Sequence, residues 1–169
     1  MADKTSESRE DRGQYVTLGV DRESFAIGIE AVREILDIRP ISRVPHAPPF
    51  LIGLIDVRGR GVPVIDLRVK LGLPPVPFTQ LTRILVLETE VAGRPQVLGL
   101  LADRVSNVTG LDGGLIEPPP EIGVRWRSRY IRGVGRCAGE FVIVFDLERL
   151  FTAEEAMLIG REPAGTAAA

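Results

Sequence analysis

An internal repeat constrains what this chain can fold into more than any other sequence feature. When the sequence is aligned with itself so that Gly53 falls on Gly133, six of the 15 positions in 53–67 are identical to those in 133–147. The matched residues are glycines, valines and an Asp-Leu pair: Gly53, Gly59, Val62, Val64, Asp66 and Leu67 match Gly133, Gly139, Val142, Val144, Asp146 and Leu147. This order favours two copies of one small β unit, each a hairpin followed by a helical turn. Because one copy is too small to bury a full core, the two should pack together.

A weaker internal match appears at a slightly different alignment of the two halves. It places Val32 on Val105 and Ile35 on Val108, each in a short apolar segment after a predicted hairpin strand. Unrelated β segments also resemble one another, so both a duplicated segment and a chance likeness stay open for this match.

Short runs rich in Val and Ile predict the strands, because each has strand length and is bounded by turn residues. They are Tyr15–Val20, Ser24–Ile29, Leu54–Val57, Val62–Leu67, Arg83–Leu87, Gln96–Leu101, Ile131–Cys137 and Glu140–Phe145. The connections at 21–23 and 58–61 are short enough for hairpins, and the second offers glycine where φ must be positive. The chain is therefore predicted to be mostly antiparallel β.

Helical spacing of apolar residues is brief. It predicts short helices at 32–36 and 67–71 and a longer C-terminal helix within 147–158. Asp66 and Asp146 each end a strand run and precede a leucine, which is where an N-cap residue stands. We expect both to be helix caps.

The length of 169 residues leaves room for one ordinary domain of about 150 residues. The Pro-rich segment 73–78 is predicted to be an extended linker between two halves, 14–78 and 79–158. The polar segment 1–13 and the small-residue segment 159–169 lack apolar content, so we expect flexible tails.

Composition excludes several functional classes. Lys plus Arg is 21 and Asp plus Glu is 23, so the net charge of −2 argues against binding nucleic acid by bulk charge. With Cys137 and His46 each alone of its type, one chain cannot form a disulfide, a Cys/His zinc cluster or a two-histidine metal site. We expect neither metal nor cofactor. No apolar run reaches the length of a membrane span and no apolar leader begins the chain, so a cytoplasmic protein without direct membrane insertion is predicted.

Catalytic candidates are weak. His46 lies between prolines with no nucleophile motif nearby, so a loop residue is predicted. A carboxylate-dependent hydrolase would need two aspartates facing one cleft, and the candidates are Asp56, Asp66, Asp103 and Asp146. The segment 125–132 interleaves four arginines with Trp126 and Tyr130, the one place where a nucleic-acid stacking site could be argued. We expect no catalytic residue, and a protein-binding adaptor is the leading class.

Ordered motifs spread over residues 13–158 point to a family. They are Val32-Arg33-Glu34-Ile35, Pro45-x-Ala47-Pro48-x-Phe50-x-x-Gly53, Val57-Arg58-Gly59, Pro63–Arg68, Gly99–Val105, Ile116–Pro120 and Tyr130–Gly133. In order and spacing they resemble the CheW chemotaxis coupling proteins. The resemblance implies two five-stranded β-barrels, similar to SH3 barrels, that share a hydrophobic core. The first would span about 14–78, and the second about 79–158 with the C-terminal helix.

The resemblance also implies a non-enzymatic role. Such proteins bridge the cytoplasmic tip of transmembrane chemoreceptors to the regulatory domain of the CheA histidine kinase, so recruitment to receptor arrays is expected. The receptor tip would lie in an apolar groove between the barrels. By resemblance, groove positions are Leu18, Ile29, Val32, Ile35, Val105 and Val108, with coupling positions at Glu34, Gly53 and Arg58.

Two residues depart from the family pattern. Asp56 stands where asparagine is common, and Gly61 replaces a β-branched residue in the strand after the turn. Glycine there should weaken the strand and loosen the hairpin that carries Arg58. A related pathway, such as one governing surface motility or development, is therefore an alternative to ordinary chemotaxis.

Overall fold

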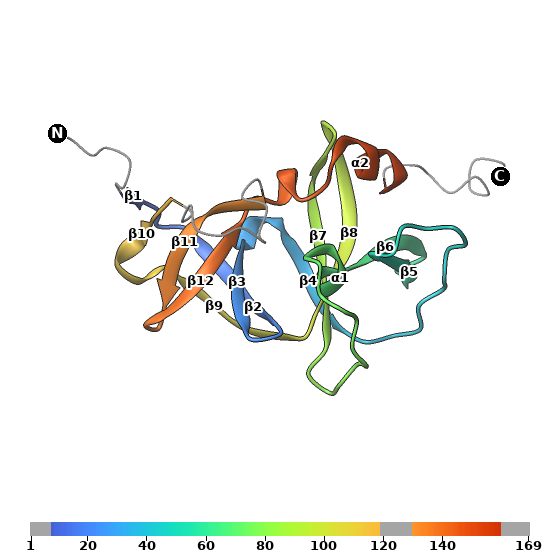
Figure 1. Ribbon diagram of the computed structural model, residues 1–169, viewed down its shortest axis with the longest axis horizontal. Helices are drawn as coiled ribbons and strands as arrows, with labels where there is room; N and C mark the ends of the chain where they lie inside the picture. Colours follow the sequence, from blue (N-terminus) through green and yellow to red (C-terminus); the bar gives the residue numbers. More distant parts are fainter. Residues whose placement is uncertain (1–7, 119–129, 160–169) are drawn as a thin grey trace.

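Two five-stranded sheets form the body of the molecule. The structure is a computed structural model that describes residues 8–118 and 130–159. Sheet 1 has the order β11-β12-β3-β2-β9, with bounds β2 Gln14–Val20, β3 Glu23–Gly28, β9 Arg104–Gly110, β11 Ile131–Cys137 and β12 Glu140–Phe145. Sheet 2 has the order β4-β7-β8-β6-β5, with bounds β4 Val32–Asp37, β5 Leu51–Val57, β6 Arg60–Asp66, β7 Arg83–Val91 and β8 Arg94–Ala102. Figure 1 shows sheet 1 on the left and sheet 2 on the right. The prediction of a mostly β chain with two five-stranded units is confirmed.

The two halves of the chain exchange strands. Sheet 1 combines β2 and β3 from the first half with β9, β11 and β12 from the second, and sheet 2 combines β4, β5 and β6 with β7 and β8. The exchange is reciprocal, because β12 pairs in parallel with β3 and β6 pairs in parallel with β8. The expected division into one barrel at 14–78 and another at 79–158 is therefore wrong. Each sheet needs both halves to be complete.

The repeated segments form matching hairpins, as predicted. In β5 and β6, Gly53 is paired with Val64 after a bulge, and in β11 and β12 Gly133 is paired with Val144 after a bulge at the same place. The turns match as well, with left-handed Arg58 (φ 52°) before one glycine and left-handed Ala138 (φ 54°) before the other. The hairpins thus agree in register, bulge and turn over their whole length.

Further equivalences extend the repeat. An isolated bridge joins Ser42 to Leu54, and its counterpart joins Glu117 to Val134. Because Leu54 and Val134 are equivalent in the matched hairpins, residue 42 corresponds to residue 117. Segments 39–41 and 114–116 therefore occupy equivalent places.

The register corrects the weaker internal match. The first hairpins of the two halves turn at left-handed Asp21 and left-handed Ala92, respectively. Val16 of β2 and Leu87 of β7 each lie five residues before their turn, so they are equivalent. Val16 pairs with Val108 and Leu87 pairs with Val32. Val32 is therefore equivalent to Val108 and not to Val105.

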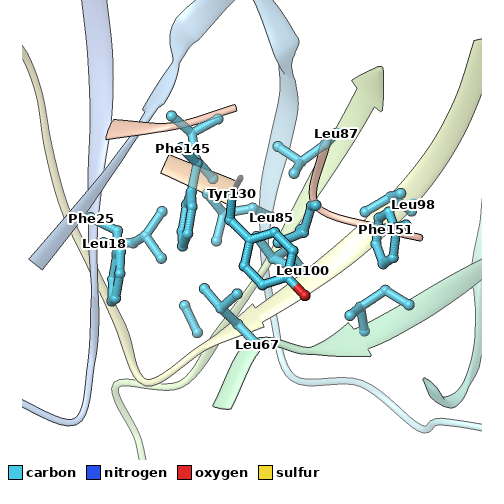
Figure 2. Packing of buried hydrophobic residues seen from close by; sticks show 14 of the residues in the cluster. Leu18, Phe25, Leu67, Leu85, Leu87, Leu98, Leu100, Tyr130, Phe145 and Phe151 are labelled. Atoms are coloured by element: carbon cyan, nitrogen blue, oxygen red, sulfur yellow. The ribbon is translucent and has the colours of Figure 1, made fainter. Parts of the chain in front are cut away.

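One hydrophobic cluster joins the two sheets. Leu18 and Phe25 of sheet 1 lie in the same buried cluster as Leu85 and Leu100 of sheet 2, and Figure 2 shows these side chains converging. The rings of Phe25 and Phe145 stack with their centroids 4.7 Å apart. Burial of this much apolar surface is the main force that holds the sheets together, so the expected shared core is confirmed.

Helix predictions succeed in part. Helix α1 (Leu67–Lys70) follows β6, and the Asp66 side chain accepts a hydrogen bond from the Arg68 backbone N–H, as a cap should. The C-terminal prediction splits into the 3-10 turn η5 (Leu147–Arg149) and helix α2 (Ala153–Ile159). Asp146 precedes η5, but its side chain makes no capping bond.

The predicted helix at 32–36 is wrong. Segment 32–36 lies within strand β4, whose residues alternate between half-buried and exposed, because its pairing with β7 determines the backbone there. The 3-10 turn η2 (Ile29–Ala31) precedes it. The Pro-rich segment 73–78 connects α1 to β7 and so joins the two halves of the chain, but the strands before and after it, β6 and β7, belong to the same sheet.

The expected tails are shorter than predicted. Strand β1 (Arg9–Glu10) pairs with β10 (Leu115–Ile116), which follows the 3-10 turn η3 (Asp112–Gly114). Tyr15 Oη donates a hydrogen bond of 2.6 Å to Asp11, and this contact ties the segment to sheet 1. At the other end Ile159 is buried against the core. Residues 1–7 and 160–169 lie outside the described part of the chain.

Candidate functional site

The predicted apolar contacts lie on edge strands of both sheets. Strand β4 is the edge of sheet 2 and strand β9 is the edge of sheet 1. Val32 and Val105 are half-buried and pack against the shared core. Ile35 and Val108 are exposed, with 43% and 53% of their surface accessible, and Ile29 on η2 is also exposed. The shared core thus continues outward on both sheets into side chains that water still reaches.

A charged pair borders the sheet 2 part of this surface. Arg58 Nη1 donates to Glu34 Oε2 across 2.7 Å, which joins the β5–β6 turn to β4. A hydrogen bond within the β5–β6 turn stabilises it, because the Gly59 N–H donates to Asp56 Oδ1 across 2.7 Å. The aspartate at position 56 therefore makes a structural contact in this turn. Arg58 remains largely exposed while it holds Glu34.

Gly61 does not disrupt the hairpin. It pairs with Asp56 in regular antiparallel register, and a Cβ added to it would meet only Leu54 Cδ1 at 3.8 Å. The hairpin thus keeps its pairing with β5 at this position.

Leu18 and Gly53 do not present side chains to a partner. Leu18 is 1% exposed in the shared core, so its expected place in the groove is wrong. Gly53 is buried with φ 154°, and a Cβ there would lie 2.2 Å from the Ser42 carbonyl oxygen. Only glycine fits a position that combines a positive φ with a backbone oxygen this close to the place of a Cβ. Both residues support the surface from within.

A buried arginine that sequence reasoning missed joins the two sheets. Arg68 donates to Asp103 Oδ2 across 2.7 Å and to the Pro74 carbonyl oxygen across 2.8 Å. Asp103 also accepts a hydrogen bond from the Asp21 N–H, so α1, the β2–β3 turn and the β8–β9 connection meet at one carboxylate. The only sequence signal for this contact was Asp66-Leu67-Arg68 after a strand. A helix cap explained the aspartate and gave no role to the arginine.

A second missed contact docks the C-terminal helix. Lys70 Nζ donates to Glu155 Oε1 across 2.8 Å, and its side chain is 4% exposed. The ammonium lies 5.0 Å from the centroid of the Tyr130 ring and 5.3 Å from that of Phe50, close enough for cation–π attraction. Burial raises the pKa of Glu155, but hydrogen bonds from Lys70 and Thr152 outweigh burial and leave that pKa below its ordinary value.

The catalytic alternatives gain no support from the geometry. His46 lies in an exposed turn with φ 61°, as the loop prediction requires. Asp56 and Asp103 make the structural contacts above, and Asp146 pairs with Arg149. Burial raises the pKa of Asp66, although its capping hydrogen bonds and Arg68 oppose that shift.

Two remaining observations concern nucleic-acid binding and membrane insertion. Most of segment 125–132, with Trp126, lies outside the described residues. Among the helices that the structure describes, none has the length and apolar character needed to cross a bilayer.

Comparison with known proteins establishes the family. The family model named CheW-like domain matches residues 14–155. A probable chemotaxis protein CheW of Rhizobium etli is 31% identical over 142 residues, covering 84% of this chain and 89% of the relative. The chemotaxis protein CheW of Klebsiella aerogenes is 32% identical over 146 residues, covering 86% of each. The crystal structure of scaffolding protein TtCheW from Thermoanaerobacter tengcongensis superposes with a TM-score of 0.74 at 28% identity, covering 85% of this chain and 95% of the other. The chain therefore belongs to the CheW-like family of chemotaxis scaffold proteins.

Proposed function

We propose that this chain couples the cytoplasmic tips of chemoreceptors to the regulatory domain of a CheA-type histidine kinase. It acts as a scaffold and catalyses no reaction. It works in the cytoplasm and is recruited to receptor arrays at the membrane. The same coupling could serve a receptor pathway for surface motility or development, and the choice depends on which receptor and kinase share its cell.

One observation carries the receptor half of this proposal. Ile35 of sheet 2 and Val108 of sheet 1 are exposed apolar side chains on the edge strands of the two sheets, and Ile29 lies on the turn η2. Turn η2 contacts both β2 and β7, so it stands where the sheets meet. Exposed apolar side chains such as these gain free energy when an amphipathic helix covers them.

The Arg58–Glu34 ion pair adds charged groups at the border of this apolar surface. The partly buried Glu34 is held by Arg58, whose guanidinium is mostly in solvent and can also reach a partner carboxylate or carbonyl. The proposed receptor site comprises Ile29, Val32, Glu34, Ile35, Arg58, Val105 and Val108. Leu18 and Gly53 shape it without contacting the receptor.

A bridging assay tests the proposal. A soluble receptor signalling fragment is immobilised, and retention of the kinase regulatory domain is measured with and without this chain. We expect retention only when the chain is present, and we expect Arg58→Glu to weaken it by about tenfold, because glutamate would repel Glu34 and reverse the charge at the border of the apolar surface. The matched control is Arg94→Glu, an exposed arginine on the β7–β8 hairpin. Equal retention with and without the chain would refute the coupling role.

A further inference from the structure

A pocket of about 710 Å³ opens on sheet 2, and none of the proposed receptor residues lines it. The β4–β5 connection, β5, α1 and the loop before β7 form its walls. Ile52, Val69 and Phe78 give it apolar surface, and Arg39 and Arg43 give it positive charge. We propose that this pocket binds an extended acidic segment of a partner protein.

The equivalent place on sheet 1 is already occupied. Segment 39–41 lines the pocket and corresponds to segment 114–116 of the other half. There, strand β1 pairs with β10 and the Asp11 N–H donates to the Gly114 carbonyl oxygen across 2.6 Å. The repeat unit can therefore hold an extended segment at this position. Within the described residues, no strand pairs with the outer edge of segment 39–41.

The occupied site shows how an acidic side chain is recognised. Asp11 has a side chain that is 8% exposed, and it accepts a hydrogen bond from Tyr15 Oη and pairs with Arg132 Nη2 across 3.2 Å. Arg132 stands where Ile52 stands in the other half, because each directly precedes the matched glycine of its hairpin. In this half of the repeat, a carboxylate from an extended segment neutralises a basic group on the sheet.

The open pocket places its charges differently. Its wall at Ile52 is apolar, and the basic groups lie on the β4–β5 connection instead. Arg39 Nη1 donates to the Asp56 carbonyl oxygen across 3.0 Å, which steadies a guanidinium that keeps other donors available. Asp66 also lines the pocket, but its carboxylate already accepts the Arg68 N–H. The net charge of the lining therefore favours an anionic ligand.

The chemistry of the ligand follows from this arrangement. Phe78 and Val76 are 48% and 42% exposed on the loop that forms one wall, and they offer contacts for apolar side chains. Pro40 stands where Leu115 stands in the occupied site and has no N–H to donate. The segment is therefore held more by side chains than by a strand ladder, with carboxylates toward Arg39 and Arg43.

Titration of the full ¹⁵N-labelled chain tests this inference. The probe is a blocked nonapeptide in which Val, Asp, Leu and Glu alternate, and the matched peptide carries Asn and Gln instead. We expect shift changes centred on residues 39–43 and 76–78, with affinity at least about fivefold weaker for the amide peptide. Arg43→Glu should weaken binding by about tenfold, whereas Arg94→Glu should leave it unchanged.

Several results would overturn the inference. They are no shift changes at millimolar acidic peptide, shifts centred outside the pocket, equal affinity for both peptides, or equal effects of the two arginine substitutions. The variant Ile35→Asp separates this site from the proposed receptor site, because it should bind the peptide normally. If the native chain binds the peptide but does not bridge receptor and kinase, the coupling proposal alone is refuted, and if it bridges them but does not bind the peptide, the pocket proposal alone is refuted.

Discussion

The β5–β6 and β11–β12 hairpins share a backbone but differ at their tips. Both turns have a left-handed residue before a glycine, and that residue is Arg58 in one hairpin and Ala138 in the other. Arg58 reaches out to Glu34, whereas the Ala138 N–H donates inward to Asp112. The two hairpins share their pairing, but one tip carries a charged side chain that binds Glu34, and the backbone of the other tip is held by the Asp112 carboxylate. Equivalent turns of a repeat can thus make different contacts.

The segments after the hairpins differ in a similar way. Lys70 of α1 occupies the position equivalent to Leu150, and both lie in the core region. Leu150 is an ordinary buried apolar residue, but Lys70 needs Glu155 and the surrounding aromatic rings to hold its charge. The Lys70–Glu155 ion pair therefore joins the two halves and anchors α2.

Replacing Lys70 by the residue of the other half should have the largest effect. Lys70→Leu leaves Glu155 partly buried without its cation, which typically costs about 3–5 kcal/mol of unfolding free energy. Urea unfolding measures the loss. The double variant Lys70→Leu/Glu155→Gln should recover much of it, because no unpaired charge remains. An unchanged midpoint in the single variant would show that the pair does not anchor α2.

Adding a methyl group to Gly53 should have the next largest effect. Gly53→Ala should cost about 2–3 kcal/mol, because its Cβ would clash with the Ser42 carbonyl oxygen at a strained φ. Gly61→Ala is the matched control on the neighbouring strand and should change the thermal midpoint little. If Gly53→Ala keeps full stability but loses coupling, position 53 contacts a partner directly and the structural explanation is wrong.

The two aspartates of the repeat should respond differently to alanine. Asp66→Ala removes a capping bond and should cost about 1 kcal/mol, whereas Asp146→Ala should cost less, because Asp146 makes no such bond. Asp66→Asn should retain most of the stability, since asparagine also caps helices. Chemical denaturation of the three variants gives the comparison, and equal losses for Asp66→Ala and Asp146→Ala would contradict it.

Alkaline pH should release the segment that covers sheet 1. Burial and the hydrogen bond to Asp11 raise the pKa of Tyr15 from 10.0 to about 12. Because the pKa of Tyr15 is raised in the folded state, the stabilisation that its hydrogen bond to Asp11 provides is complete below pH 10 and is lost as the pH rises toward 12. Protection factors of residues 9–13, which are corrected for the intrinsic rise of exchange with pH, should fall over that interval, and Tyr15→Phe should remove this change. Protection factors that stay constant in the native chain would contradict the assignment.

The local structure was largely predictable from the sequence, and the pairing between halves was not. The Gly53–Leu67 repeat identified both hairpins because turn glycines and alternating valines are local signals. The parallel pairing of β3 with β12 joins segments near opposite ends of the chain, and no local pattern encodes such a choice. Strand exchange between the halves was therefore missed.

The candidate site was predictable in outline. Exposed Ile35 and Val108 were identified, but Leu18 could not be separated from them, because an apolar residue in a strand can face either the core or solvent. Helical spacing at 32–36 was misleading because burial alternates along β4 but residue type does not follow it: the polar Glu34 is half-buried and the apolar Ile35 is exposed. The burial of Arg68 and Lys70 could not be predicted, because their partners Asp103 and Glu155 are distant in the sequence and only the fold brings them close.

The central claim is that one receptor site draws on the edge strands of both sheets. It is tested most directly by titrating receptor signalling fragment against Ile35→Asp and Val108→Asp, with Met157→Asp on α2 as the exposed control. We predict that each of the first two weakens receptor binding by about tenfold, because a carboxylate must lose water against an apolar helix. Thermal midpoint and kinase binding should stay near wild type, and Met157→Asp should bind normally. Loss of receptor binding in only one of the two, or in neither, would contradict a site that spans both sheets.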